Sequence, residues 1–346
     1  MDPYLYEIRP LPLREPHLSR LIAFLSSCGL RWDPTLTRYL GVYRGDRLVA
    51  GGGIAGRVIK CVAVDPDYRG EGLLGALIAR LRAELAGQPG PVFLFTKPDN
   101  GPIFADLGFA LLERTDAVLL MTSDPGDFSQ YLQTLAPYRT GGRIGAAILN
   151  ANPFTLGHQY LVESAAARCD RLLVFVVEED LSEVPFDIRL RLVQEGCAHL
   201  PQVSVLPGGD YIISQATFPT YFLQNLDDAS RIYTELDARI FAGRIAPAAG
   251  ISVRFVGEEP FSPLTALYNQ TMASLLPEAG IDLVVLPRKK AAELPISASH
   301  VRALLARGDL AAARPLLPDT TYQFFTRPEA QPVLSRIRAA GKGVRP

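Results

Sequence analysis

Apolar positions in the second half of the chain alternate between strand-like and helix-like spacing. Residues 144–149 form an apolar run of the length of a buried strand. Asn152-Pro153 interrupts this run, and apolar residues then recur at helical spacing over 161–166. Further strands are predicted at 171–177, 203–206, 252–256 and 281–286, with helical patterns at 185–193, 229–242 and from 266. Strands separated by helices form right-handed crossovers, so we expect a Rossmann-like parallel sheet in this α/β part of the chain.

The first 122 residues carry a different order of elements. Strand patterns are predicted at 4–9, 40–43, 48–51, 58–64, 92–97 and 117–121, and helices at 15–28, 76–85 and 100–107. The sequence Arg44-Gly45-Asp46-Arg47 predicts a tight hairpin turn between two of these strands.

These patterns predict two domains, a connector and a tail. The first domain covers 1–122 and the second covers 143–329. The segment 123–142 contains Pro and Gly around a short helical piece, which is typical of a linker. The basic segment 330–346 is weakly patterned, so we expect a frayed C-terminal tail.

Composition and charge narrow the class of protein. The 346 residues include 35 Lys and Arg against 36 Asp and Glu, so the net charge of -1 gives no electrostatic argument for a nucleic acid or membrane partner. No signal peptide and no run of membrane-spanning length is predicted. The four cysteines are scattered without a C-x-x-C pair, which indicates reduced thiols in a cytoplasmic protein and predicts no metal site.

The predicted junction between the strand at 144–149 and the following helix carries Thr155, Gly157 and His158. The N-terminus of a helix offers free N–H groups and the positive end of its dipole, which suits a phosphate group. Gly157 lets a ligand approach the backbone, Thr155 offers a hydroxyl, and His158 offers an imidazole. We expect His158 to be neutral at pH 7 because it lies near this positive end. The motif alone is more typical of a helix-capping Thr beside a surface His.

A second motif follows the last predicted strand. Ser297 and Ser299 precede Arg302 at another predicted helix start, where hydroxyls can cap the helix or bind phosphate and Arg302 can neutralise a triphosphate. Arg288 and Lys289, within the basic run 288–290, come shortly before it. One of these three basic residues is expected to contact phosphate, the alternative being a solvated charged face.

Three further segments have both a functional and a structural interpretation. Arg189 is either a ligand-binding residue or part of a surface ion pair. The acidic residues 178–180 follow a predicted strand and either position a nucleotide-bound Mg²⁺ or form a solvated loop. The segment 208–223 mixes hydroxyls and aromatic side chains, which indicates a substrate pocket, a lid or a packed loop.

The first domain resembles a GNAT-type acetyltransferase, whose fold is α+β. The motif is Pro66-x-Tyr68-Arg69-Gly70-x-Gly72, followed by Asn100, Phe104 and Leu107-Gly108-Phe109. The resemblance implies that Arg69, Gly70, Gly72 and Gly75 bind the pyrophosphate of a coenzyme A-like group, or that they are a retained scaffold. Leu74 departs from the small residue of the family pattern. Little in the sequence supports Glu113 or Tyr68 as the general base that amine acetylation needs, so an independent acetyltransferase activity is not predicted.

Taken together, the motifs resemble those of the citrate lyase ligase family, which combines a GNAT-like domain with a nucleotidyltransferase domain. The resemblance rests on the segments 150–158, 211–219, 256–260 and 296–302. Membership implies that acetate and ATP, with Mg²⁺, form acetyl-AMP and pyrophosphate. The acetyl group then passes to the thiol of the phosphoribosyl-dephospho-coenzyme A arm on the citrate lyase acyl carrier protein, which activates the lyase.

The resemblance also implies roles for single residues. His158 and Thr155 would contact the α- and β-phosphates, and Ser297, Ser299 and Arg302 the β- and γ-phosphates. The other residues expected to bind ATP are Asn152, Phe154, Gly157, Arg189, Arg288 and Lys289.

Two other classes of function remain open from the sequence. One is a bifunctional enzyme that joins an amine acetyltransferase to a cofactor adenylyltransferase of the nicotinamide mononucleotide or phosphopantetheine type. The other is a non-catalytic module that regulates citrate lyase by docking to its carrier protein.

Overall fold

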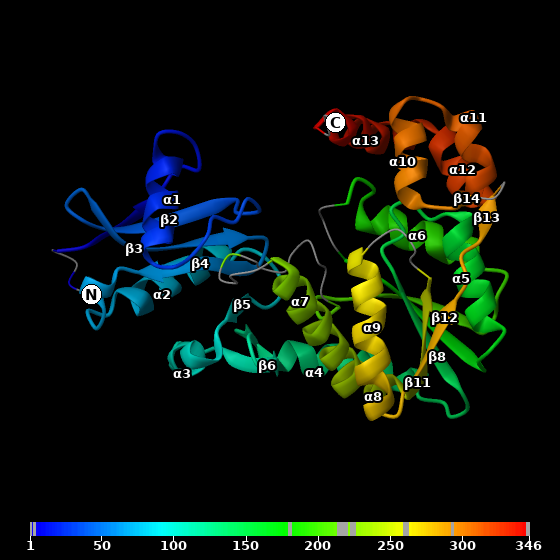
Figure 1. The fold of residues 1–346 in the computed structure, drawn as a ribbon, viewed down its shortest axis with the longest axis horizontal. Coiled ribbons are helices and arrows are strands. Elements are labelled where there is room, and N and C mark those ends of the chain that lie inside the picture. The colour runs from blue at the N-terminus through cyan, green and yellow to red at the C-terminus, as the bar shows by residue number, and fades with distance from the viewer. Residues whose placement is uncertain are drawn as a thin grey trace. The chain divides into compact units, whose positions relative to one another are not determined.

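The computed structural model describes residues 2, 5–178, 182–212, 221, 226–258, 263–291 and 294–343, and it divides into two compact units. Unit 1 contains Met1–Gln130 and Thr217–Leu236, and unit 2 contains Tyr131–Ala216 and Asp237–Pro346 (Figure 1). The second stretch of unit 1 lies far from the first in the sequence, whereas the predicted organisation is continuous. The domain bounds drawn from the sequence stay a prediction.

Unit 1 is built on a seven-stranded sheet with the order β1-β2-β3-β4-β5-β7-β6. Its strands are β1 (Glu7–Pro10), β2 (Arg38–Arg44), β3 (Arg47–Ala55), β4 (Val58–Val64), β5 (Phe93–Thr96), β6 (Ala110–Arg114) and β7 (Leu119–Thr122). Its helices from the first stretch are α1 (His17–Ser27), α2 (Leu73–Leu85) and α3 (Gly101–Asp106), with α4 (Pro125–Leu135) at the end of that stretch. The α+β prediction is confirmed, and β6 is an element that the sequence pattern missed.

The single parallel pair in this sheet is β4 and β5, and all the other neighbouring strands are antiparallel. The two strands are paired at Val58 with Phe93 and at Ile59 with Leu94. Leu77 and Leu81 of α2 are buried in the core that covers the sheet. The hairpin predicted at Arg44–Arg47 joins β2 to β3 as expected.

Unit 2 is built on a five-stranded parallel sheet with the order β10-β9-β8-β11-β12, so the prediction of a Rossmann-like sheet is confirmed. Its strands are β8 (Ile144–Leu149), β9 (Arg171–Val176), β10 (Val203–Pro207), β11 (Ile251–Gly257) and β12 (Asp282–Leu286). A separate antiparallel pair is formed by β13 (Lys290–Ala291) and β14 (Leu294–Pro295).

The α-helices after α4 are α5 (Leu156–Ala166), α6 (Phe186–Cys197), α7 (Leu226–Ile240), α8 (Ala246–Ala249), α9 (Pro263–Glu278), α10 (Ala298–Ala306), α11 (Leu310–Ala313), α12 (Asp319–Thr326) and α13 (Gln331–Gly343). Between α7 and α8 the chain makes a π-helical stretch, Phe241–Ile245. Short 3₁₀ turns occur at Pro66–Tyr68, Pro98–Asn100, Ala136–Tyr138, Arg314–Leu316 and Pro328–Ala330.

The strand order creates a switch point between β8 and β11. From β8 the chain moves outward through β9 and β10, and it then returns to the other side of β8 to form β11 and β12. In Figure 1, α5 and α9 lie on opposite sides of these strands. Ligands of open parallel sheets bind outside the carboxyl ends of the strands at such a point.

Residues 331–343 form a helix and are not frayed, which corrects the sequence expectation for this part of the C-terminal segment. Residues Gln331–Gly343 form α13, and Val333, Leu334 and Ile337 of this helix are buried in the main core of unit 2. Their spacing places them on one helical face, and burial of that face stabilises the helix. In the part of the chain that the structure describes, no helix has both the length and the apolar character needed to cross a membrane.

Candidate active site

A cavity of about 730 Å³ opens at the switch point of the unit 2 sheet. The carboxyl end of β8 contributes Ile148 and Leu149 to its lining, Asn150 follows directly after the strand, and β11 contributes residues 254–257. The starts of α5 and α10 complete much of the wall. The sequence-predicted residues that line the cavity are Thr155, Gly157, His158, Arg288, Lys289, Ser297 and Ser299.

Thr155 and His158 form the N-terminal cap of α5. The backbone N–H of His158 donates to Thr155 Oγ1 (3.4 Å), and the backbone N–H of Thr155 donates to His158 Nδ1 (3.1 Å). Thr155 Oγ1 also lies 3.0 Å from His158 Nδ1. A histidine therefore takes the place that Glu or Gln occupies in the usual capping box. Thr155 is only 1% exposed, and its hydroxyl is engaged inside the cap.

The cap fixes the proton on the imidazole of His158. Because Nδ1 accepts a backbone hydrogen bond, the neutral ring carries its proton on Nε2, the other nitrogen. Burial, together with a smaller contribution from the positive charge of Arg288, lowers the pKa of His158 to about 4. The expectation of a neutral His158 is therefore supported, with burial as the main cause. A neutral imidazole that lines a cavity and carries its proton on Nε2 can donate to a phosphoryl oxygen.

Gly157 brings the two motifs together. A Cβ atom at this position would lie 3.2 Å from the backbone carbonyl oxygen of Ile296, directly before the second motif. The first turn of α5 thus packs closely against the approach to α10. Ser297 caps α10 by accepting a hydrogen bond from the N–H of His300 (3.0 Å), so its hydroxyl lies at a helix N-terminus.

The basic residues after β12 lie at the same rim. The Nε of Arg288 donates to the backbone carbonyl of Glu258 (2.7 Å), which connects the carboxyl ends of β12 and β11. The ammonium group of Lys289 lies 5.9 Å from the centre of the Tyr160 ring, within cation–π distance. Both side chains border the cavity, and their charges favour an anionic ligand there.

Arg302 and Asn152 form a network next to the cavity and are not part of its lining. Arg302 Nη1 donates to the carbonyl oxygen of Asn152 (2.6 Å), and its Nη2 donates to Ser299 Oγ (3.4 Å). Glu183 Oε2 lies 3.4 Å from Arg302 Nε and accepts a hydrogen bond from Asn152 Nδ2 (2.6 Å). The network ties α10 to the segment between β8 and α5.

Phe154 is fully buried beneath His158. The two rings stack with centroids 6.0 Å apart, and the Phe154 ring also packs against Gly196 of α6, where a Cβ atom would come within 2.4 Å of it. Phe154 thus supports the imidazole from the side of the core. Phe154 does not line the cavity, so the structure gives no support to its predicted contact with ATP.

Arg189 does not line the cavity, and its side chain is buried in the protein and not at its surface. It is 0% exposed. Its Nη1 donates to the carbonyl oxygens of Asn150 (2.7 Å) and Val177 (2.7 Å) and to the Asn150 side chain, and its Nε donates to the carbonyl of Val184 (3.0 Å). The carbonyl groups of Asn150 and Val177 directly follow β8 and β9, so Arg189 holds the two strand ends together from within the protein.

Four polar lining residues lie outside the motifs and were missed by the sequence interpretation: Tyr160, Arg254, Tyr268 and Asn269. Arg254 had a signal, because it is the single charge inside an otherwise mostly apolar strand pattern at 252–256. Tyr268 and Asn269 lie on α9, and nothing in their local sequence distinguishes them from surface residues.

Part of the sequence interpretation concerns residues outside the described chain. These are Glu179 and Asp180, most of the segment 208–223, and Glu259 and Pro260. Among the residues that are described, no group of three or more His, Cys, Asp or Glu side chains could hold a metal ion.

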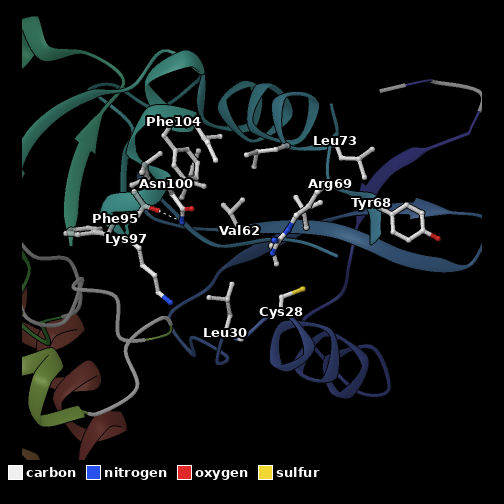
Figure 2. A pocket seen from close by; sticks show the side chains of 18 of the residues that line it. Cys28, Leu30, Val62, Tyr68, Arg69, Leu73, Phe95, Lys97, Asn100 and Phe104 are labelled. Carbon is white, nitrogen blue, oxygen red and sulfur yellow. Dashed lines mark hydrogen bonds between the residues drawn. The ribbon is translucent and has the colours of Figure 1, made fainter. Parts of the chain in front are cut away.

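Unit 1 contains a cavity of its own, of about 780 Å³. It lies next to the parts of β4 and β5 that follow their two paired positions. Val62–Val64 line it on one side and Phe95–Lys97 on the other. Figure 2 shows the side chains of Arg69 and Lys97 extending into the space bordered by Leu30 and Cys28.

The glycine-rich loop forms one end of this second cavity. Arg69, Gly70 and Gly72 line it, directly before α2. Gly70 and Gly72 have φ values of 85° and 71°, a region that favours glycine. Gly75 lies within α2, does not line the cavity, and packs near Leu107. Two cations and the N-terminus of α2 thus border one apolar cavity.

Comparison with known proteins identifies relatives along most of the chain. The model of the citrate lyase ligase C-terminal domain matches residues 144–325. The citrate (pro-3S)-lyase ligase of Escherichia coli (strain K12) is 41% identical over 316 residues, which are 89% of this chain and 90% of that protein. The corresponding ligase of Klebsiella pneumoniae is 43% identical over 287 residues, 81% of this chain and 84% of that protein. The ligase of Haemophilus influenzae is 37% identical over 320 residues, 90% of this chain and 95% of that protein.

Proposed function

The chain belongs to the citrate lyase ligase family, and from this premise we propose that it activates citrate lyase by ATP-dependent acetylation of the lyase acyl carrier protein. The enzyme is an acid–thiol ligase. In the first half-reaction acetate and ATP give acetyl-AMP and pyrophosphate. In the second, the acetyl group passes to a thiol on the carrier protein and AMP is released.

The observation that best supports adenylation in unit 2 is the capped His158. Acetate is ionised at neutral pH and needs no general base, so catalysis consists of alignment and stabilisation of the charge on the phosphates. His158 would donate from Nε2 to an α- or β-phosphate oxygen without changing its protonation state. Ser297, Ser299, Arg288 and Lys289 border the same cavity and would hold the remaining phosphate oxygens.

The structure suggests an indirect role for three of the residues predicted to bind ATP. Thr155 positions the His158 ring through the cap, and Arg189 fixes the strand ends beneath the rim. Arg302 ties α10 to Asn152 and reaches Ser299. We propose that these residues act on the nucleotide through their neighbours, and that Arg302 also contributes positive charge near the triphosphate.

Mg²⁺ fits this site as a companion of the triphosphate. The described residues offer no protein-built cage for a metal, and Mg²⁺ commonly binds through substrate phosphates and one or two carboxylates. Glu258 is a carboxylate that lines the cavity and could serve in this way. When bound, the ion would neutralise charge on the leaving pyrophosphate.

We further propose that the cavity of unit 1 binds the nucleotide end of the carrier protein's phosphoribosyl-dephospho-coenzyme A arm. Arg69 and Lys97 offer cations to its phosphates, and the apolar walls suit a pantetheine chain. A fused coenzyme A-like site would then recruit the thiol for the second half-reaction. We place the reaction in the cytoplasm, in agreement with four free cysteines.

The decisive experiment is ATP–pyrophosphate exchange with purified protein and Mg²⁺, with and without acetate. We expect acetate-dependent exchange that His158→Ala abolishes and that His199→Ala preserves, because His199 is an exposed histidine paired with Glu163. Exchange that depends on a phosphate-ester acceptor and not on acetate would instead support a cofactor adenylyltransferase. A protein that binds the carrier but never exchanges would support the regulatory module.

A further inference from the structure

We infer that Arg254 is the residue that binds the carboxylate of acetate, at the end of the unit 2 cavity that reaches into the sheet. The inference rests on the proposed adenylation of acetate and assigns its second substrate a position. Arg254 lies in β11 and lines the same cavity as His158 and Ser299.

The first argument is that the guanidinium group of Arg254 is buried without an anion. The residue is 3% exposed, and no carboxylate of the described part of the chain forms an ion pair with it. Its Nε and Nη1 atoms are shielded from solvent and have no hydrogen-bond partner there. A buried cation with two nitrogen atoms that lack acceptors is costly, so a carboxylate that enters this cavity would find two donors ready to bind it.

The second argument concerns the groups around Arg254. Its guanidinium carbon lies 4.4 Å from the centre of the Phe241 ring, which holds the cation from one side. The hydroxyl of Tyr268 donates to the buried carboxylate of Asp237, so this carboxylate already has a hydrogen-bond donor. Burial and the Asp237 carboxylate raise the pKa of Tyr268, and the charge of Arg254 and its hydrogen bond to the Tyr268 hydroxyl oppose that shift, so Tyr268 remains a neutral hydroxyl beside the cation.

A comparison with Arg189 supports the assignment of Arg254 to acetate. Both arginines are buried within unit 2, but Arg189 donates to at least three protein carbonyl groups and does not line the cavity. Arg189 is therefore satisfied by the protein itself, as expected of a structural arginine. Arg254 shows the opposite combination: it lines the cavity, and it has guanidinium nitrogens without acceptors among the described residues.

The position of Arg254 along β11 suits an attack by acetate on the α-phosphorus of ATP. Arg254 lies three residues before Gly257, the last residue of the strand, which places its backbone about 10 Å below the rim at about 3.3 Å per residue. The nucleotide-binding groups of α5 and α10 are at the rim, and acetate would lie beneath the α-phosphate. One acetate oxygen would attack the α-phosphorus, and the bond from that phosphorus to the bridging oxygen would break. Pyrophosphate leaves with the bonding electron pair, and no proton is transferred.

The test is steady-state ATP–pyrophosphate exchange in Arg254→Lys and Arg254→Gln. We expect the KM for acetate to rise at least about tenfold in both, because a charge-assisted bidentate contact is lost, while the KM for ATP changes less than about twofold. Arg244→Gln is the matched control, since it removes an exposed positive charge from the same π-helical stretch that carries Phe241.

ATP binding measured by calorimetry shows whether Arg254→Gln folds. If it does not, a second variant keeps the test decisive. Tyr268→Phe leaves the ring but removes the donor to Asp237, whose carboxylate would then compete with acetate for Arg254. A raised KM for acetate with normal ATP binding is expected here too.

Three outcomes can be told apart. If the wild-type protein shows no acetate-dependent exchange, the proposed function itself fails. If it exchanges but the folded variants keep the wild-type KM for acetate, the assignment of Arg254 is overturned. If the KM for ATP rises instead, Arg254 belongs to the nucleotide site and the assignment is equally overturned.

Discussion

Thr155 and His158 form a reciprocal pair in which each backbone N–H donates to the other residue's side chain. This pairing caps α5 and leaves the proton of the neutral imidazole on Nε2. One local structure thus stabilises the helix and prepares a hydrogen-bond donor in the cavity.

The lowered pKa of His158 predicts a pH-dependent stability. The native pKa is about 4, against about 6.5 in the unfolded chain. Between these values the unfolded state binds more protons, so the free energy of unfolding falls as pH decreases, by at most about 1.4 kcal/mol per pH unit. Urea denaturation at pH 7.5 and 5 should show this fall in the wild-type protein and a smaller one in His158→Gln. An imidazole NMR signal of native His158 that titrates near pH 6.5 would contradict the prediction.

Thr155→Val should separate positioning from direct phosphate contact. Loss of the capping hydroxyl should destabilise the protein by about 1 kcal/mol and lower kcat for exchange, because the His158 ring loses its fixed orientation. Thr155→Ser keeps the hydroxyl and should behave like the wild type in denaturation and kinetics. If Thr155→Val raises only the KM for ATP and leaves stability unchanged, the hydroxyl binds phosphate directly.

Arg189→Lys should be a stability variant. A lysine cannot reproduce the forked donors of a guanidinium, so we expect a loss on the order of 3 kcal/mol in the free energy of unfolding. Arg191→Lys is the control on the same helix, where the ion pair with Glu329 is exposed and should contribute less than about 1 kcal/mol. Chemical denaturation measures both. A stable Arg189→Lys protein with a raised KM for ATP would restore the ligand role that the sequence suggested.

Arg69→Gln should affect the second half-reaction alone. If the unit 1 cavity binds the carrier arm, acetyl transfer to the carrier thiol should slow at least about tenfold, because a cation that contacts phosphate is lost. Acetate-dependent ATP–pyrophosphate exchange should remain normal. Arg80→Gln, on an exposed part of α2, should leave both reactions unchanged. Normal thiol transfer in Arg69→Gln would argue that the GNAT-like fold is only a scaffold.

Local periodicity determined much of the architecture. Apolar runs and helical spacing are properties of neighbouring residues, so the strands β8, β9, β11 and β12 and the parallel sheet could be predicted from the sequence. The glycine-rich loop before α2 could also be predicted from the sequence, since its positive φ values favour glycine. The prediction failed at α13, where the apolar spacing of Val333, Leu334 and Ile337 was short and its packing partners are distant in sequence.

The roles of polar side chains depended on tertiary structure. The sequence marked Thr155, His158, Ser297 and Ser299 as chemistry-bearing, and the fold brought all four to one cavity because Gly157 packs against Ile296. It could not show that Arg189 is a buried structural residue while Arg254 lines the cavity. That difference depends on which acceptors distant segments supply, because burial removes water as a partner and leaves only what the fold provides.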